Sequence, residues 1–409
     1  MALMTFFTYI VYFGLGIYCF GLVCLIRFVR KKIPALKSDQ PLPGVSIIKT
    51  CYKAEDNEEV NFDILFHQDY PVPYQILFVV SSDTDPIVPL IQTFLTRYPK
   101  VDAQLVVSKT RKAFWKKVDA LYDGYRLVKH DFVIWSDSDV ILKSNYITQM
   151  AASLQEPGVA LVTTPQYDAR ANNFPSALKA LGNNCDVATH MMILDAMTTW
   201  KKHGFGQSIG FKKKDLDQMG KKVWETMNTF LADDQALPYL FYHEGKKVVF
   251  QNIYCPVEFS NKTFGNVIRQ KIRWLLPQKM ALGNRYSYIL SVIGYPVATS
   301  FLMMICTQLS PHSIRLFIAS CLMRVFISFT FEILVLKDFR MSLRYFWTIP
   351  IWDIMHLYFF IHGFFKTTIQ FENRKFKVVN RYFVKEIADP LQAPALKSGS
   401  KAKNLLEIG

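Results

Sequence analysis

The sequence predicts an α/β protein whose mostly parallel sheet is attached to a membrane by helices at both ends of the chain. Between residues 42 and 261, short β-branched and aromatic runs alternate with helical patterns, which is typical of βαβ units. Long apolar runs lie before and after that region. A net charge of +15 accompanies a hydrophobic fraction of 51%. This combination indicates a membrane partner and argues against a soluble nucleic-acid-binding protein or a disordered basic tail.

The N-terminal segment is the first predicted membrane element. Residues 5–26 carry no charge, and about 20 apolar residues are enough to span a bilayer. Basic residues follow at once, which predicts that the chain is cytoplasmic from residue 31 onward. We therefore expect residues 1–30 to form an uncleaved anchor; a cleaved signal peptide is the alternative. The basic residues are Arg27, Arg30, Lys31 and Lys32.

Residues 42–261 are the predicted cytosolic domain. Ligands of parallel α/β sheets bind at the carboxyl ends of strands, so the residues just after each strand are candidates for the site. Strands are expected at 45–49, 74–81, 103–107, 132–136 and 159–163, and helices at 55–67, 86–97, 116–128 and 145–154.

The rest of the chain returns to the membrane. Residues 262–284 are predicted to form an amphipathic interfacial helix, and residues 287–366 are predicted to form a membrane region. Within that region, 287–309 and 313–336 are predicted spans. The third stretch, 344–366, is predicted to be re-entrant or interfacial, because groups such as Asp353 and His356 are costly at bilayer depth. Residues 367–409 then form a basic tail, predicted to be cytoplasmic.

The first candidate chemical site follows the hydrophobic run 132–136. Asp137 and Asp139 stand two residues apart at the carboxyl end of a predicted buried strand. They can present oxygen ligands to Mg²⁺ or Mn²⁺, and such a cation would neutralise a diphosphate leaving group. The alternative is a strand-ending turn, because aspartate favours turns.

Two further candidates follow along the chain. Asp233 and Asp234 precede a helical pattern, so Asp234 is either a general base for an acceptor hydroxyl or part of a helix cap. Gln270, Arg273 and Trp274 lie in the basic stretch 262–281. The alternative for that stretch is a plain interfacial helix that meets anionic headgroups.

The order of these motifs resembles that of the family 2 inverting glycosyltransferases with a GT-A fold. In that group the sequence resembles the ceramide glucosyltransferase family and its bacterial lipid-glycosylating relatives, from about residue 5 to 385. The resemblance implies that Asp137 and Asp139 bind the metal and the sugar diphosphate, and that Asp234 is the catalytic base. It further places Lys117 near the donor, and it makes Gln270, Arg273 and Trp274 the motif that closes over donor diphosphate and acceptor.

Two positions depart from the family pattern. The aspartate expected directly after the second strand, for the nucleotide, is Ser82 here, with Asp83 and Asp85 as the nearby carboxylates. The acceptor histidine of the family corresponds to His190 as a candidate; the alternative is an ordinary polar residue on a surface helix.

The resemblance implies transfer of a hexose, with glucose as the first expectation, from a UDP-sugar to the hydroxyl of a membrane lipid, with ceramide as the expected acceptor. A divalent cation, Mg²⁺ or Mn²⁺, is the expected cofactor. The protein is expected to be integral to a bacterial inner membrane or a Golgi membrane, with its catalytic domain cytosolic. A processive polysaccharide synthase and a catalytically inert, membrane-associated lipid-binding protein are the alternatives; nucleic acid is not an expected partner.

Overall fold

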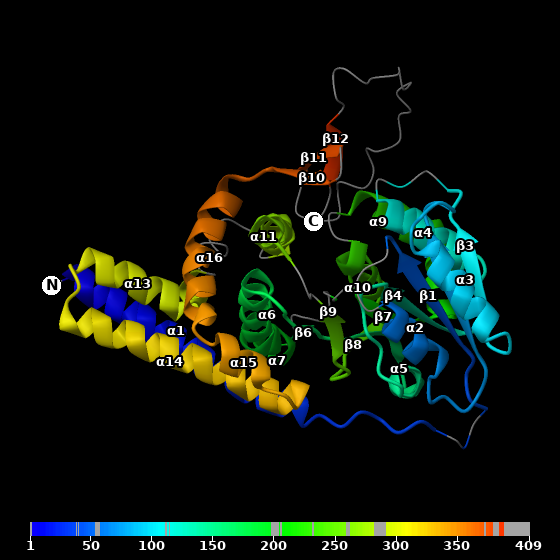
Figure 1. Cartoon of the computed structure of the whole chain (residues 1–409), viewed down its shortest axis with the longest axis horizontal. Coiled ribbons are helices and arrows are strands. Elements are labelled where there is room, and N and C mark those ends of the chain that lie inside the picture. Colours follow the sequence, from blue (N-terminus) through cyan, green and yellow to red (C-terminus); the bar gives the residue numbers. More distant parts are fainter. Residues whose placement is uncertain are drawn as a thin grey trace.

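A computed structural model describes most of the chain and shows an elongated molecule (Figure 1). Three apolar helices, α1, α13 and α14, lie side by side at one end, and a large sheet with its helices forms the other end. The described residues are 2–37, 39, 41–53, 58–110, 113, 115–197, 204, 207–230, 233–258, 262–281, 292–371, 374–378 and 384–387.

The central sheet confirms the predicted α/β class. It has seven strands in the order β3-β2-β1-β4-β7-β5-β8, and only β7 runs antiparallel to its neighbours. Strands β1, β2, β4, β5 and β7 are almost entirely buried, as expected of a sheet covered on both faces, whereas the edge strand β3 is partly exposed. Their bounds are β1 Val45–Cys51, β2 Tyr74–Val80, β3 Asp102–Val107, β4 Phe132–Asp137, β5 Val159–Thr163, β7 Ser208–Lys212 and β8 Lys247–Phe250.

Each face of this sheet has its own helical layer and its own core. Neighbouring side chains of a strand point to opposite faces, so Ile47 packs in one core and Ile48 in the other. The helices α2 (Glu58–Phe66), α3 (Val88–Arg97) and α5 (Tyr146–Gln155) cover the first face. On the second face lie α4 (Lys116–Tyr125), α8 (Lys213–Met219), α9 (Lys221–Thr229) and α10 (Asp233–His243).

A smaller layer joins the sheet to the membrane helices. Strands β6 (Gln166–Arg170) and β9 (Cys255–Glu258) pair in parallel and lead to α6 (Phe174–Asp186). The chain continues through the π-helical turn η1 (Val187–Met191) into α7 (Met192–Ala196). These elements share a third core with α1 and α14, so this layer is packed directly on those two helices.

Two helices are long and apolar enough to cross a membrane: α1 (Ala2–Val29), and α14 (Pro311–Phe331) with its π-helical continuation η4 (Glu332–Leu336). The second predicted span, 287–309, differs from the structure. Over its described part, the turn η3 (Val292–Gly294) precedes a shorter helix, α13 (Pro296–Cys306). The reason is local: Pro296 occupies the first turn of the helix, where no backbone N–H is needed, and Leu309 has positive φ beyond its end.

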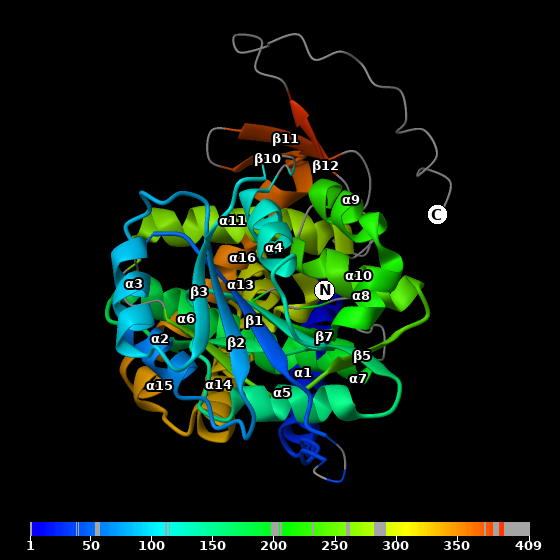
Figure 2. The ribbon, with the colours of Figure 1, turned by 90° about the vertical axis from the view of Figure 1, so that its right-hand side faces the viewer.

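The remaining elements lie across and above this bundle. Helices α15 (Arg340–Tyr345) and α16 (Thr348–Phe365) replace the single stretch predicted at 344–366, and α16 runs across the direction of α1 and α14 (Figure 1). Helix α11 (Phe264–Ala281) packs on α6 and α16. A three-stranded antiparallel sheet follows α16 and lies above α11 and α4 (Figure 2). Its strands are β10 Thr368–Phe371, β11 Arg374–Val378 and β12 Val384–Ile387.

Candidate active site

The structure brings Asp137 and Lys117 together at the carboxyl end of the sheet. Asp137 is the last residue of β4, and Thr50 of the parallel neighbour β1 stands opposite it. The Thr50 hydroxyl donates to Asp137 Oδ1 at 3.3 Å, and Lys117 Nζ, near the start of α4, lies 2.7 Å from the same oxygen. Both ionic side chains are about one-third exposed. The carboxylate is therefore oriented by two elements and stays open to ligand.

A buried lysine supports the turn that carries this carboxylate. Lys49 of β1 is 1% exposed, and its Nζ donates to the Val140 carbonyl at 2.8 Å and to Ser136 Oγ at 3.3 Å. Burial lowers the pKa of Lys49, and the nearby charges of Asp137 and Asp139 oppose that shift. The sequence signal for this role was a lysine within a mostly apolar strand, and no role was predicted for Lys49 from the sequence.

Asp137 and Asp139 suit a hard divalent cation. Among the described residues, no group of three or more His, Cys, Asp or Glu side chains is placed to hold a metal ion. Mg²⁺ needs fewer protein ligands, because it retains several waters and takes the rest of its shell from one or two carboxylates and substrate phosphates. The donor set therefore fits Mg²⁺ or Mn²⁺ shared with a diphosphate.

The second strand end places the nucleotide candidates beside this pair. Asp85 Oδ1 accepts hydrogen bonds from the backbone N–H of Lys53, at 2.9 Å, and of Ile87, at 3.1 Å. It thus ties the loop after β1 to the loop after β2. Asp83 is exposed at the same strand end, with Ser82 Oγ 3.5 Å from its carboxylate. Asp85 is accordingly engaged in holding the loops, whereas Asp83 faces outward.

Helix α10 begins at Asp233, as the sequence predicted for this position. The side chains of Asp233 and Asp234 lie outside the described part of the structure, so the role of Asp234 stays a prediction. Shortly before α10, the backbone contacts the segment that precedes α4: Trp115 Nε1 donates to the Phe230 carbonyl at 2.9 Å. Trp115 directly precedes α4, the helix that carries Lys117, so this hydrogen bond links Phe230 to the start of that helix.

The helix α11 presents two different faces. Arg273 is exposed and Gln270 is half-buried, whereas Trp274 turns toward α6, where Lys179 Nζ lies 5.3 Å from the centre of its ring. Lys179 is itself buried and pairs with Asp168 of β6 at 2.9 Å. Burial lowers the pKa of Lys179 to about 8. No sequence pattern pointed to this pair, because only the packing of α6 on β6 brings the two residues together.

His190 is partly buried, with 25% of its side chain exposed, and its role at the acceptor side stays a prediction. Its Nε2 lies 3.1 Å from the Gly294 carbonyl, its Nδ1 lies 4.0 Å from Asp186, and its ring packs on Tyr295. Burial lowers the pKa of His190. The amphipathic run looks like a surface helix in sequence, but η1 is covered by α1, where Tyr18 faces the histidine.

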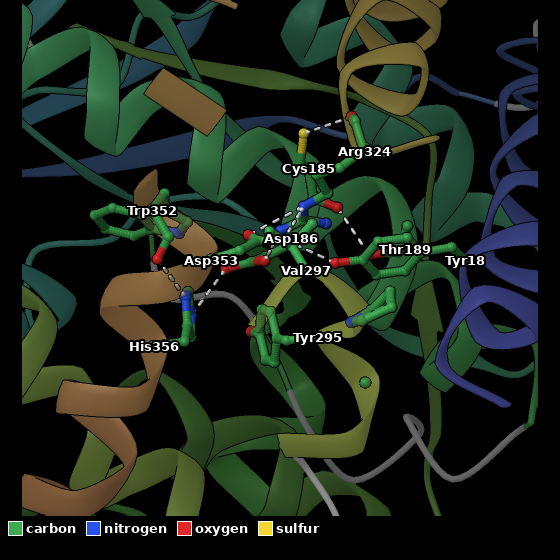
Figure 3. A network of polar contacts seen from close by, with 12 residues as sticks. Tyr18, Cys185, Asp186, Thr189, Tyr295, Val297, Arg324, Trp352, Asp353 and His356 are labelled. Atoms are coloured by element: carbon green, nitrogen blue, oxygen red, sulfur yellow. Dashed lines mark hydrogen bonds and ion pairs between the residues drawn. The ribbon is translucent and has the colours of Figure 1, made fainter. Parts of the chain in front are cut away.

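Beside His190 lies a network of buried charges that the sequence analysis did not anticipate (Figure 3). Arg324 of α14 is fully buried and bonds two carboxylates: its Nε lies 3.0 Å from Asp353 of α16, and its Nη2 lies 2.5 Å from Asp186 of α6. The Tyr18 hydroxyl donates to Asp353 at 2.9 Å. Asp353 and His356 were noted in the sequence as polar residues of an apolar stretch; an arginine inside an apolar span was a further available signal.

Comparison with known proteins agrees with this architecture. A family model described as Glycosyl transferase family 21 matches residues 7–382. Ceramide glucosyltransferase 3 of Caenorhabditis elegans is 28% identical over 268 residues, which cover 63% of this chain and 56% of that protein. A ceramide glucosyltransferase of Candida albicans is 30% identical over 132 residues, covering 30% of this chain and 24% of that protein. The chain spans about half the length of the curated relatives it matches, or less.

A solved structure agrees with the fold. Mannosyltransferase PcManGT from Pyrobaculum calidifontis, in complex with GDP-Man and Mn²⁺, has a TM-score of 0.51 and 16% sequence identity. The similarity covers 88% of this chain and 97% of that one. Together with the family match, it confirms the predicted GT-A fold.

Proposed function

Because this chain belongs to glycosyl transferase family 21, we propose that it transfers one hexose from a UDP-sugar to the hydroxyl of a membrane lipid, with inversion at the anomeric carbon. Glucose is the proposed sugar and ceramide the proposed acceptor. The names of the curated relatives support both.

The observation that carries the proposal is the Lys117–Asp137 pair at the carboxyl ends of β4 and β1. A carboxylate and an ammonium at one strand end match the needs of a sugar diphosphate, which binds through a cation and through direct positive charge. Asp137 and Asp139 would hold Mg²⁺ or Mn²⁺. When bound, that ion supplies positive charge to the departing diphosphate. The Mn²⁺ in the mannosyltransferase structure is consistent with this choice.

Side chains of the protein would carry out the remaining steps of the transfer. We assign to Asp234 the removal of the proton from the acceptor hydroxyl as that oxygen attacks the anomeric carbon. Arg273, exposed on α11, would place its guanidinium at the departing diphosphate, and Asp83 would contact the nucleotide. Gln270, Trp274 and His190 are proposed to line the acceptor side, since η1 packs on α1, and α11 packs on α6, which leads directly into η1.

A lipid acceptor fits the architecture. Helices α1 and α14 are long and apolar enough to span a bilayer, and α6 packs against α14. The charge flanking α1 favours a cytosolic catalytic domain. The acceptor hydroxyl would therefore reach the site from the membrane, and the UDP-sugar from the cytosol.

Product analysis tests this function directly. The purified protein in nanodiscs is incubated with a panel of UDP-sugars and lipids, with and without Mn²⁺, and the products are identified by mass spectrometry. We expect a single hexose on ceramide and a requirement for the cation. A ladder of polymer lengths would replace the proposal with a polysaccharide synthase. Lipid binding without any transfer would indicate the inert binding protein.

The assignment of the base has its own test. Asp234→Asn is expected to abolish turnover and to leave UDP-sugar binding nearly intact, because the amide keeps the shape and loses only the basic group. Asp338→Asn, an exposed aspartate far from the site that pairs with Arg340, is the matched control. Loss of UDP-sugar binding in Asp234→Asn would reject the assignment.

A further inference from the structure

The helix α11 has a buried lysine inside its functional motif. Lys271, directly after Gln270, is 4% exposed, whereas Arg269 and Arg273 on either side of it are exposed. The buried face of α11 is otherwise apolar: Val267 packs with Trp352 of α16 in a small core. An ammonium group within such a face must be paired, because an isolated buried charge is strongly unfavourable.

The partner of Lys271 is the carboxylate at the centre of the buried network. Its Nζ lies 3.4 Å from Asp186 Oδ2 and 5.0 Å from the centre of the Trp352 ring. Asp186 is held in turn by Arg324 at 2.5 Å and lies 3.6 Å from His356 Nε2. Burial alone would raise the pKa of Asp186, but the charges of Lys271 and Arg324 hold it below its ordinary value. The carboxylate, which ends α6, is thus ionised and held by residues of α11, α14 and α16 (Figure 3).

We infer that Lys271 and Asp186 are positioning residues for the glycosyl transfer: their ion pair sets the rotation of α11 and so places Gln270 and Arg273 at the site. This inference rests on the proposed function. At about 100° per residue, the four side chains follow one another around the helix in the order Arg273, Gln270, Trp274 and Lys271, so the packed side of α11 adjoins the side that carries Gln270 and Arg273. Each residue turns the helix by about 100°, so a small rotation of α11 would withdraw both functional side chains together.

A second contact makes the rotation unique. Trp274 meets Lys179, which precedes Asp186 on α6 by about two helical turns. The two helices therefore touch at two polar points: Lys271 with Asp186, and Trp274 with Lys179. Apolar packing alone tolerates sliding, whereas a buried ion pair loses its partner on any change of register. Such pairs contribute little net stability, and a specific geometry is their best-attested use.

The test compares Lys271→Met, which keeps an unbranched chain and removes the ammonium, with Arg269→Met, which removes a positive charge from the exposed face of the same helix. We expect Lys271→Met to lower kcat at saturating donor by about tenfold or more, because small misplacements of catalytic groups are costly. UDP affinity is expected to fall by much less than kcat, since the donor residues on β4 and α4 are untouched and only the contact of Arg273 with the diphosphate is lost. Arg269→Met is expected to behave as the unsubstituted protein.

Hydrogen exchange gives a readout that does not depend on activity. In Lys271→Met, amide exchange is expected to rise in peptides from 264–281 and to stay constant in peptides from β1 and β2. Lys271→Arg keeps the charge and is expected to restore both kcat and protection; it also tests the inference should Lys271→Met fail to fold. If the unsubstituted protein transfers no hexose, the proposed function fails. The hydrogen-exchange result then tests by itself whether the Lys271–Asp186 ion pair positions α11.

Three results would overturn the inference. The first is a kcat of Lys271→Met within twofold of Arg269→Met. The second is a uniform rise in exchange across the protein, which would show a purely structural role. The third is a Lys271→Arg variant that folds but recovers neither kcat nor the protection of residues 264–281 from amide exchange.

Discussion

Arg324→Met is the substitution with the largest expected effect on stability. Arg324 is fully buried, and its two partners, Asp353 and Asp186, are 0% and 13% exposed. Methionine fills much of the same volume but leaves Asp353 with the Tyr18 hydroxyl and Asp186 with Lys271 at 3.4 Å. Removing one partner of a buried ion pair costs about 3–5 kcal/mol, because the other charge stays buried without compensation. For a chain of 409 residues, this corresponds to a fall in Tm of roughly 5 °C.

The assay is thermal unfolding of the purified protein in detergent, followed by tryptophan fluorescence. Arg340→Met is the matched control, because Arg340 also pairs with an aspartate, Asp338, at 2.6 Å but is 87% exposed. It is expected to leave Tm unchanged. The double variant Arg324→Met with Asp353→Asn is expected to regain part of the loss, since it removes one of the uncompensated charges. If the single variant Arg324→Met has the same Tm as the Arg340→Met control, the reasoning is refuted.

Three further predictions test other parts of the structure. Gly182→Ala on α6 is expected to lower Tm, because the added Cβ would lie 2.2 Å from the Trp352 ring, whereas Gly16→Ala on α1, with open space around it, is not expected to lower it. Burial lowers the pKa of Lys179 to about 8 from 10.5, so the folded protein releases this proton before the unfolded chain does. The Tm of the unsubstituted protein minus the Tm of Lys179→Met should therefore increase from pH 8 to pH 10.5. A difference that stays constant over this range would contradict the lowered pKa of Lys179. Phe376→Ala removes a fully buried ring that packs on the start of α4 and should speed proteolysis after α16 without changing Tm; an unchanged cleavage rate would show that this ring does not hold the sheet.

Much of the fold was predictable because local patterns report on it directly. The buried run Phe132–Asp137 forms β4, and Asp137 stands at its carboxyl end as expected. Neighbouring parallel strands end at one edge of a sheet, so candidates placed after different strands converge there. Asp85 follows β2, and Lys117 begins the helix after β3; both lie at that edge. The long apolar helix α1 was equally visible.

The sequence by itself therefore determined the α/β class, the apolar helices α1 and α14, and the strand-end carboxylate Asp137, since each depends on residues close together along the chain. The tertiary structure alone decided the environment of His190 and the charge network of Arg324. Arg324 and Asp186 are 138 positions apart, and they meet only because α6 packs against α14. A charge within an apolar helix signals that a partner must exist. Which carboxylate serves as that partner is decided by helix packing, because the attraction between two buried charges depends on their distance in space and not on their separation along the chain.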